Sequence, residues 1–508
     1  MNDNSRTKNT TKNVLSGLIN KVILLLLSFV SRKVFINYIG VEYLGINSLF
    51  ANILTILSLA DMGFGIAMSY SYYKPLANRD EKMLAALVQF YKKIYNIIAI
   101  IVTTVGICFI PFLRYIVNTD SQIDHLYIYY LIALSNTVIS YLFVYKSNMI
   151  SADQKSYLVN KIQLWVIFSK TIIQMICVII FKNYTIYASL DVLATLVNNL
   201  VISHFADKLY PFINNKNVEP LDSHSKKSIY TNLKSVFLYK FSASIMSGTD
   251  SIIMSSIVGT AVVGMYTNYL TITSQITSFV QIVFSSFTAS IGNLVIEDRD
   301  QKNYQVFRVM QMVSHFMSGV IAVCLLSLAN EFIILWLGPE FNMGELMAIA
   351  ITANTYFTIS LQPIWSYREA TGLYNKTKYV MVATAFLNIV LSIIMGIAMG
   401  APGIIFATVI SRIFTYFWYE PNLVYKLYFQ HSSKEYYFDY IVSIALIIVA
   451  YRMSSYFYSM VSLSGWFAWI VHALISGLIT LLLYFVRYGW TKEFKTLIEK
   501  IHYIIAQH

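Results

Sequence analysis

Long apolar stretches alternate with short polar ones along almost the whole chain. The apolar stretches are about 20 residues or longer, which is the length that a helix needs to cross the hydrocarbon core of a bilayer. Only a helix satisfies all of its backbone hydrogen bonds within one such segment. The pattern therefore predicts an all-α integral membrane protein with fourteen transmembrane helices. Their approximate ranges are 14–36, 46–70, 86–111, 126–147, 158–181, 187–206, 234–256, 262–290, 306–330, 345–366, 379–399, 402–425, 438–459 and 467–488.

The basic residues of the polar stretches test this number of helices. Loops on the cytoplasmic side of a membrane carry an excess of Lys and Arg. If the N-terminus is cytoplasmic, the inside loops hold clusters such as Lys74, Arg79 and Lys82, whereas the outside loops hold only Arg114 and Lys182. One missed helix would invert every later loop and remove this asymmetry. We therefore expect both termini to be cytoplasmic.

Composition agrees with the membrane assignment. Of the 508 residues, 57% are hydrophobic and 12% are charged, whereas soluble domains usually carry about 25% charged residues. The net charge of +12 would suggest a nucleic-acid partner in a soluble protein. Here the positive residues lie between the apolar stretches, so they indicate membrane topology, and we expect no nucleic-acid partner.

The polar stretch 207–233 divides the predicted helices into two groups. It contains two prolines and several lysines, which is typical of a linker, and it lies on the cytoplasmic side. We therefore predict an N-lobe of six helices at 1–206 and a C-lobe of six helices at 234–425. Residues 426–508 then form two additional helices and a cytoplasmic tail.

Two glycine pairs indicate an internal repeat. Gly40 and Gly45 precede one long apolar helix, and Gly259 and Gly264, with the same spacing, precede another. Both pairs lie at a predicted outside hairpin, where glycine permits a tight turn. Because six helices separate the copies, both halves cross the membrane in the same direction. This predicts two pseudo-symmetric lobes related by an axis along the membrane normal, an arrangement known among transporters.

Four basic residues inside predicted helices are candidates for a functional role, because charges are rare there and usually functional. They are Arg32 in the outer half of the first helix, Lys170 in the fifth, Lys240 in the seventh and Arg412 in the twelfth. The functional interpretation is a cationic, water-filled cavity between the lobes that binds an anionic group such as a phosphate. The alternative is that these side chains snorkel to the interface or form structural ion pairs.

The acidic candidates inside predicted helices are Asp61 in the second and Asp250 in the seventh. They can balance nearby cations, or they can take a coupling proton or sodium ion. Uncharged polar residues can meet sugar hydroxyls or form interhelical hydrogen bonds, and the second role is the commoner one. These residues are Asn52, Gln174, Asn198, Asn199, Asn268, Gln275, Gln281, Gln362 and Asn388. Tyrosines near helix ends, such as Tyr72 and Tyr436, predict interfacial aromatic belts.

Signatures of catalysis are absent from the sequence. It contains no Walker A motif, no His-Glu-x-x-His motif and no Gly-x-Ser-x-Gly motif. His315 and His472 stand alone within predicted helices, so we expect packed histidines rather than metal ligands. The longest outside loop, near residues 331–345, is too short for a catalytic domain. We therefore expect a protein that is not an enzyme, with no metal site and no catalytic residues.

Several apolar motifs resemble a known family. They are Phe35 to Phe50, Leu57 to Gly65, Tyr73 to Ala77, Thr249 to Ile253 and Gly259 to Tyr269. The chain resembles the polysaccharide-repeat (Wzx-type) flippases of the multidrug/oligosaccharidyl-lipid/polysaccharide (MOP) exporter superfamily. The resemblance implies a MATE-like, V-shaped pair of lobes around a central cavity that works by alternating access.

The resemblance also implies a function. Such flippases move an undecaprenyl-pyrophosphate-linked oligosaccharide from the inner to the outer leaflet of the bacterial plasma membrane, for surface polysaccharide export. Family cavities are typically cationic, with an arginine at the position of Arg32. Peptidoglycan-precursor flippases often place an acid beside that arginine, where this chain has Lys33. Implied partners are the lipid-linked substrate, membrane lipids, a polysaccharide polymerase and glycosyltransferases, with coupling to a proton or sodium gradient.

Two other function classes remain as alternatives. An ion-coupled exporter of drugs or small molecules from the same superfamily would use Asp61 or Asp250 as its dominant cavity group. A membrane enzyme such as an envelope polymerase would need charged catalytic groups beside an exposed loop. The cationic residues and the fourteen predicted helices favour the flippase.

Overall fold

The computed structural model describes residues 23–58, 64–119, 123–153, 155–214, 220–296, 300–460 and 463–506. Within these residues the regular structure is helical and contains no strand. The chain divides into two compact units, Met1–Gly264 and Met265–His508, and each is described separately.

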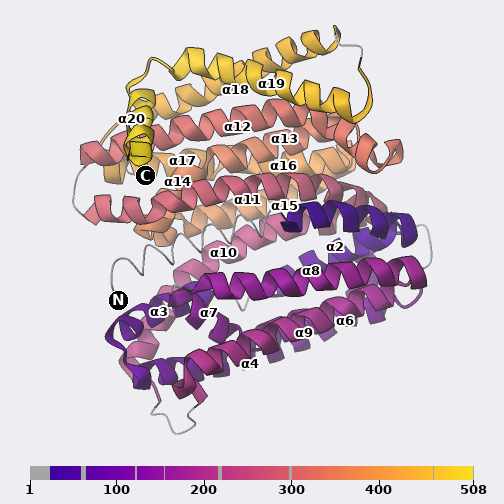
Figure 1. The fold of residues 1–508 in the computed structure, drawn as a ribbon, viewed down its shortest axis with the longest axis vertical. Helices are drawn as coiled ribbons and strands as arrows, with labels where there is room; N and C mark the ends of the chain where they lie inside the picture. The colour runs from indigo at the N-terminus through magenta and orange to yellow at the C-terminus, as the bar shows by residue number, and fades with distance from the viewer. Residues whose placement is uncertain are drawn as a thin grey trace. The chain divides into compact units, whose positions relative to one another are not determined.

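In the first unit, residues 23–38 form the first described helix. The helices that follow are α2 (Val41–Leu57), α3 (Phe64–Asn78), α4 (Glu81–Phe109), α5 (Leu113–Ile116), α6 (Leu126–Tyr141), α7 (Val144–Ala152), α8 (Ser156–Phe181), α9 (Tyr184–Leu209) and α10 (Ser223–Ile257). Short 3-10 turns occur at Ile110–Phe112 and Pro211–Asn214. Helix α9 packs against α6, α7 and α8, and α10 packs against α2 and α3 (Figure 1).

Helix α11 (Thr260–Ile296) begins in the first unit and continues into the second. The second unit then contains α12 (Asp300–Trp336), α13 (Glu345–Ser360), α14 (Gln362–Thr371), α15 (Tyr374–Met399), α16 (Ala401–Phe414), α17 (Tyr416–Val424), α18 (Lys434–Tyr458), α19 (Gly465–Tyr488) and α20 (Lys492–Ala506). A 3-10 turn occurs at Pro339–Phe341 and a π-helical turn at Tyr425–Phe429. Helix α12 is central to this unit, since α13, α18, α19 and α20 all pack against it.

The helices coincide with the predicted transmembrane stretches, although several stretches are broken into two helices. Among the described residues, eight helices are long and apolar enough to cross a membrane, and the pair α6 and α7, bent by 44°, can form a ninth. The shorter apolar helix α2 covers much of another predicted stretch. The structure is thus that of a multi-pass, all-α membrane protein, and the total of fourteen crossings stays a prediction.

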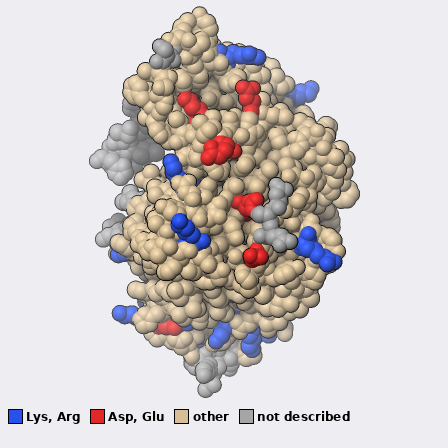
Figure 2. Space-filling model, turned by 90° about the vertical axis from the view of Figure 1, so that its right-hand side faces the viewer, with Lys and Arg blue, Asp and Glu red and all other residues tan. Residues whose placement is uncertain are grey.

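The helix surfaces have the character of lipid-facing surfaces. Large apolar side chains such as Phe386, Ile397 and Val486 are at least 70% exposed. Figure 2 shows a face on which charged side chains are few and scattered. Contiguous exposed apolar surface of this kind is rare on soluble monomers. It is expected where hydrocarbon, rather than water, surrounds the helices.

The tyrosine prediction was wrong for two of its examples. Tyr72 is fully buried and Tyr436 is 1% exposed, so neither belongs to an interfacial belt. Tyr436 instead packs its ring against Phe307 and Tyr440. The physical reason is that helices packed against one another bury aromatic rings at the helix ends as well as at the helix centres.

The glycine pairs of the predicted repeat meet within the first unit. Gly40 and Gly259 have φ angles of 106° and 131°, which favour glycine, and each precedes a helix. A methyl group added at Gly45 would lie 2.0 Å from the carbonyl oxygen of Thr260, and one at Gly264 would lie 2.3 Å from that of Val41. The equivalent residues of the two copies therefore make reciprocal backbone contacts.

The boundary of the first unit differs in position from the predicted lobe boundary. Helix α10 begins at Ser223, within the predicted linker 207–233, and packs against α2 inside the first unit. Compactness groups α10 with the preceding helices, whereas the repeat groups it with the helices that follow. The lobe assignment from the repeat stays a prediction.

Candidate functional site

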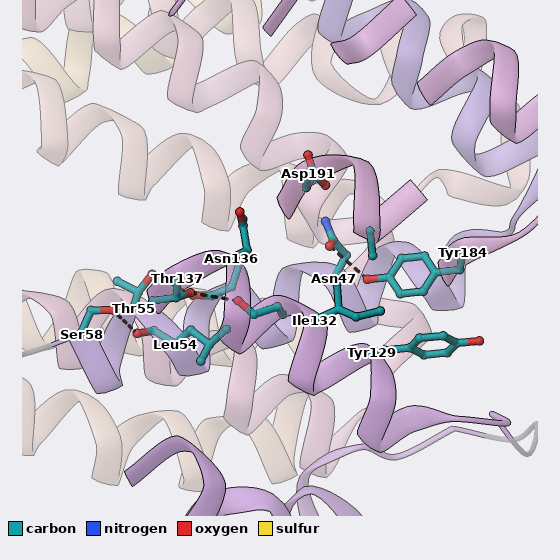
Figure 3. Close-up of a pocket in the computed structure, with 13 residues that line it drawn as sticks. Asn47, Leu54, Thr55, Ser58, Tyr129, Ile132, Asn136, Thr137, Tyr184 and Asp191 are labelled. Carbon is teal, nitrogen blue, oxygen red and sulfur yellow. Dashed lines mark hydrogen bonds between the residues drawn. The ribbon is translucent and has the colours of Figure 1, made fainter. Parts of the chain in front are cut away.

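A cavity of about 400 Å³ lies in the first unit, between α2, α6 and α9. This volume is within the range of about 300–1,000 Å³ that small-molecule sites usually have. Figure 3 shows the polar side chains that line the cavity, among them Asn47, Asn136 and Asp191. Each of the three helices contributes polar groups to the lining, so the cavity depends on how these helices pack against one another.

Three hydroxyl groups of the lining already use their protons. Thr55, Ser58 and Thr137 each donate to the backbone carbonyl four residues earlier, at 2.8, 2.6 and 3.1 Å. A hydroxyl oxygen that donates its proton keeps lone pairs that can accept. Among the described residues, the buried Oδ1 atom of Asn136 has no hydrogen-bond partner. The cavity is therefore rich in hydrogen-bond acceptors.

Tyrosines form one end of the cavity. The rings of Tyr129 and Tyr184 lie edge to face with centroids 4.8 Å apart (Figure 3). The hydroxyl of Tyr184 donates to Oδ1 of Asn47 at 3.1 Å, which fixes the orientation of that amide. The amide nitrogen of Asn47 keeps two protons that can be donated to a ligand.

Lys170, one of the predicted substrate-binding cations, is engaged in an ion pair beside this cavity. Its Nζ atom donates to Oδ1 of Asp191 at 2.6 Å, and both side chains are 24% exposed. Helices α8 and α9 form a hairpin that places the two side chains together. Because the charges cancel, Lys170 does not act as an isolated cation in this state.

Arg32 lies close to the same group of residues. Its largely buried guanidinium interacts electrostatically with Tyr187, which in turn interacts with Asp191. The carbonyl of Tyr187 accepts a hydrogen bond from Gln174 at 2.9 Å. Two of the four predicted cations, Arg32 and Lys170, are therefore brought into one polar cluster next to the cavity.

Lys240 and Asp250, two other predicted charges, do not line the cavity. The side chain of Lys240 is exposed on α10. Asp250 is 7% exposed on α10, next to Ser251, which accepts a hydrogen bond from Asn52 at 3.0 Å. Asp61 lies outside the described residues.

Arg412 belongs to the second unit. It lies on α16, and its Nη1 atom donates to the Thr358 hydroxyl of α13 at 2.9 Å. Its buried Nε atom makes no hydrogen bond with the described residues. Arg412 is thus held by a neutral partner, and this leaves its positive charge available to an anionic group.

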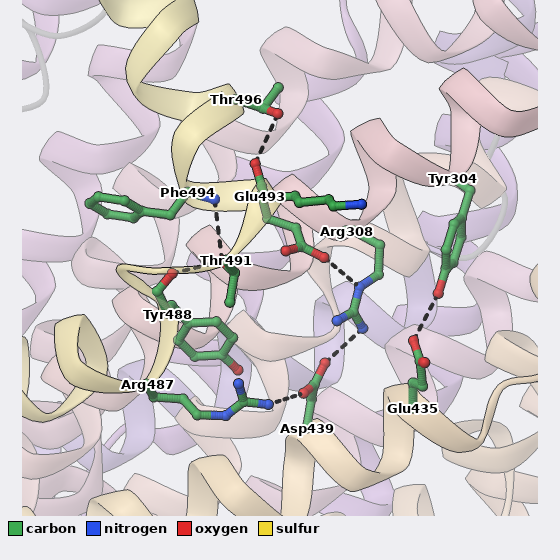
Figure 4. Close-up of polar contacts among 11 residues, drawn as sticks. Tyr304, Arg308, Glu435, Asp439, Arg487, Tyr488, Thr491, Glu493, Phe494 and Thr496 are labelled. Atoms are coloured by element: carbon green, nitrogen blue, oxygen red, sulfur yellow. Dashed lines mark hydrogen bonds and ion pairs between the residues drawn. The ribbon is translucent and has the colours of Figure 1, made fainter.

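Ion pairs that sequence reasoning missed connect four helices of the second unit (Figure 4). Asp439 of α18 accepts from Arg308 of α12 at 2.7 Å and from Arg487 of α19 at 3.3 Å. Arg308 also pairs with Glu493 of α20 at 3.2 Å. Burial raises the pKa of Glu493, but its helix-start backbone hydrogen bond and the Arg308 charge outweigh burial, so this pKa lies below its ordinary value.

Two basic residues that the topology rule places in cytoplasmic loops are buried. Arg368 pairs with Glu420 at 2.9 Å, and Lys146 pairs with Asp207 at 2.6 Å. Arg368 lies on α14 and Lys146 lies on α7, rather than in loops. Their sequence positions indicated the side of the membrane but gave no sign of the partners.

Several uncharged polar residues form interhelical hydrogen bonds, as predicted. Asn199 of α9 donates to a backbone carbonyl of α6 at 2.7 Å, and Asn388 of α15 donates to Thr408 of α16 at 2.9 Å. His315 is buried with its ring edge-to-face against Tyr440. Within the described part of the chain, no three His, Cys, Asp or Glu side chains are grouped so that they could hold a metal ion.

Comparisons with known proteins address the fold. No protein-family model and no curated protein matches the sequence. Among solved structures, the chain is similar to the lipid II flippase MurJ in an inward closed conformation, with a TM-score of 0.66, 14% identity, and coverage of 94% of this chain and 98% of that one.

Multidrug transporters of the MATE family are similar as well. An inward-facing MATE transporter of the MOP superfamily gives a TM-score of 0.58 at 14% identity, covering 78% of this chain and 93% of that one. A variant of the Vibrio cholerae MATE transporter VcmN gives 0.53 at 14% identity, covering 81% and 95%. The chain is therefore an all-α, multi-pass membrane protein with the MATE-like fold that lipid II flippase MurJ and MATE transporters share.

Proposed function

We propose that this protein is a flippase of the MOP superfamily that moves an undecaprenyl-pyrophosphate-linked oligosaccharide across the bacterial plasma membrane. The process would be alternating access, driven by a proton or sodium gradient, and would supply a surface polysaccharide. A polymerase and glycosyltransferases would be its partners. Both termini would be cytoplasmic.

The observation that carries the proposal is the end-to-end likeness to a lipid flippase. The match with the lipid II flippase covers 94% of this chain. The matches with the MATE transporters cover only about four-fifths of this chain, although they include nearly all of the transporters' own length. About a fifth of this chain therefore has no counterpart in the MATE transporters. The MurJ flippase has the additional length, and this fuller likeness supports the proposal of a lipid-linked substrate.

The polar groups of the two units support a substrate with both an anionic and a sugar part. Arg412 offers a charge that no carboxylate neutralises among the hydrogen bonds and ion pairs of the described residues. The cavity of the first unit offers hydroxyl and amide groups. Arginine suits a pyrophosphate, and mixed hydroxyl and amide groups suit sugars.

Depletion of the protein in its source cells tests the proposal. We expect undecaprenyl-pyrophosphate oligosaccharide to accumulate on the inner leaflet, where a membrane-impermeant lectin added outside spheroplasts does not reach it. Normal delivery of the oligosaccharide to the outer leaflet, together with loss of ethidium efflux, would instead support the second candidate, a multidrug exporter. That candidate has support from the MATE likeness.

A further inference from the structure

We propose that the cavity between α2, α6 and α9 binds a neutral sugar residue of the transported oligosaccharide and does not bind its pyrophosphate. This inference rests on the proposed function and assigns the two chemical parts of the substrate to different places. The cavity lies wholly within the first unit, so the argument depends only on contacts inside that unit.

The hydrogen-bonding character of the cavity carries the inference. The hydroxyl oxygens of Thr55, Ser58 and Thr137 have donated their protons to backbone carbonyls and can only accept from a ligand. The Oδ1 atom of Asn136 accepts no hydrogen bond from the described residues, and Asp191 has a second carboxylate oxygen. The cavity therefore needs a ligand that donates hydrogen bonds.

A pyrophosphate does not meet this need. An ionised pyrophosphate has many acceptor oxygens and no donor protons, so it would face the acceptor oxygens of the lining without compensation. Each buried polar group left without a partner costs about 1–3 kcal/mol. A sugar presents hydroxyl groups that donate as well as accept, and it matches both the acceptor oxygens and the amide protons of Asn47.

The charge of the cavity wall favours a neutral ligand over a cation. Asp191 is the one acid among the described lining residues, and Lys170 neutralises it at 2.6 Å. A cationic ligand would be attracted by Asp191 but repelled by the adjacent ammonium group. Arg32 is not among the residues that line the cavity, so within the lining the pair leaves dipoles and hydroxyl oxygens, rather than a net charge, to select the occupant.

The position of the cavity fits the delivery of a sugar. Asn47, Tyr129 and Tyr184 lie near the ends of α2, α6 and α9 that follow the predicted outside loops. Under the predicted topology the cavity is in the outer half of the membrane. A sugar bound there would have passed the membrane midplane ahead of its lipid anchor.

The experiment measures equilibrium dissociation constants of the full-length protein in lipid nanodiscs. The probes are undecaprenyl pyrophosphate, the undecaprenyl-pyrophosphate oligosaccharide extracted from source-cell membranes, and tetraphenylphosphonium as a cation. The variants are Asn136→Leu, which preserves side-chain size, and Thr137→Val. Thr104→Val is the matched control, because Thr104 donates to the carbonyl four residues earlier at 2.9 Å but is exposed on α4, outside the cavity.

We expect Asn136→Leu and Thr137→Val each to weaken oligosaccharide binding by about threefold to tenfold. Binding of undecaprenyl pyrophosphate should not change, which also shows that the variants are folded. Thr104→Val should bind all probes as the parent protein does. The sugar then supplies the affinity that depends on the cavity.

Four results would overturn the inference. If the cavity variants lose binding of both lipid probes equally, the cavity is a pyrophosphate site. If both lipids bind the variants as they bind the parent protein, the cavity has no role in binding. The flippase proposal survives in both cases. Weakened tetraphenylphosphonium binding with intact oligosaccharide binding would make it a cation site. If the parent protein binds neither lipid, the proposed function and this inference fall together.

Discussion

The ion pair between Lys170 and Asp191 shows how one contact changes the role of a residue. Lys170 stood out in the sequence as a charge in the middle of an apolar helix, and we interpreted it as a phosphate-binding cation. The structure pairs it with an acid across the α8–α9 hairpin at 2.6 Å. The sequence left open the alternative that Lys170 forms a structural ion pair. The contact with Asp191 supports that alternative for Lys170.

A double-mutant cycle distinguishes the two roles of Lys170. We expect Lys170→Met and Asp191→Leu each to destabilise the purified protein by about 1–3 kcal/mol, because each leaves a lone charge. The double variant should recover much of that loss. Thermal unfolding in detergent gives the values. Additive losses without recovery would show that the two charges are not coupled.

Gly45 is a second residue whose role depends on a contact rather than on its own helix. A side chain there would meet the carbonyl oxygen of Thr260 at 2.0 Å, which is closer than atoms approach. We expect Gly45→Ala to lower the melting temperature by several degrees, because the backbones must separate. The matched control is Gly477→Ala in α19, where an added methyl group meets nothing within 4 Å.

In the control, alanine should raise stability slightly, because glycine inside a helix costs about 0.5–1 kcal/mol relative to alanine. Equal melting temperatures for the two variants would mean that the reciprocal contact at Gly45 does not hold in solution.

Sequence reasoning identified some residues of the site and missed others for a physical reason. Arg32 and Lys170 were found, since a charge in an apolar stretch is visible in one dimension. Asp191 was missed because it lies close to the predicted outside end of its helix and resembles an interfacial residue. Lys170 and Asp191 are recognised as partners only in the structure, where the antiparallel α8–α9 hairpin brings them side by side. Asn136 gave no signal, because it is one of many uncharged polar residues within the predicted helices.

At the scale of helices, the pattern of apolar stretches predicted where helices lie, but it did not predict where a helix is interrupted. The stretch 126–147 was predicted as one helix, and the structure has α6 and α7 with a 44° bend. The backbone at the break leaves the helical range at Leu142, and Phe143 has a positive φ of 67°. Neither residue is a proline or glycine, so the sequence carries no local sign of this bend.

Helix α20 follows the last predicted transmembrane helix, and an ion pair connects it to α12. Glu493 pairs with Arg308 at 3.2 Å, and its pKa lies below the ordinary value of 4.5. A carboxyl whose pKa is lower in the folded protein stabilises the fold above its ordinary pKa, and this contribution disappears as the pH falls through the lowered value. The docking of α20 should therefore be complete at neutral pH and weaken in acid.

Hydrogen exchange of residues 492–506 tests this prediction. We expect Glu493→Gln to exchange about threefold to tenfold faster than the parent protein at pH 7, because an ionic hydrogen bond is lost. Its docking should also lose the acid dependence. Glu499→Gln is the control, since Glu499 is exposed on the same helix. Equal exchange in both variants would show that the ion pair does not hold α20.

At the scale of the whole molecule, the sequence predicted the fold class, whereas the division into two repeated lobes stays a prediction. The alternation of apolar and polar stretches predicts helices directly, and the likeness to lipid II flippase MurJ and MATE transporters confirms a MATE-like fold. The glycine spacing predicts two related copies, and the structure agrees with it at these positions: Gly40 and Gly259 both have a positive φ, and Gly45 and Gly264 make reciprocal contacts. The acceptor-rich cavity could not be predicted, because it depends on how three separate helices pack.

The substrate is the central claim, and transport in proteoliposomes tests it most directly. The protein would be reconstituted with undecaprenyl-pyrophosphate oligosaccharide from source-cell membranes, and outward transfer would be followed with a membrane-impermeant glycosidase. We predict transfer by the parent protein and at least a tenfold loss in Arg412→Ala, with normal insertion and Tm, because Arg412 has a neutral hydrogen-bond partner and a charge available to pyrophosphate. No transfer by the parent protein under any imposed proton or sodium gradient, with ethidium transported instead, would contradict the account.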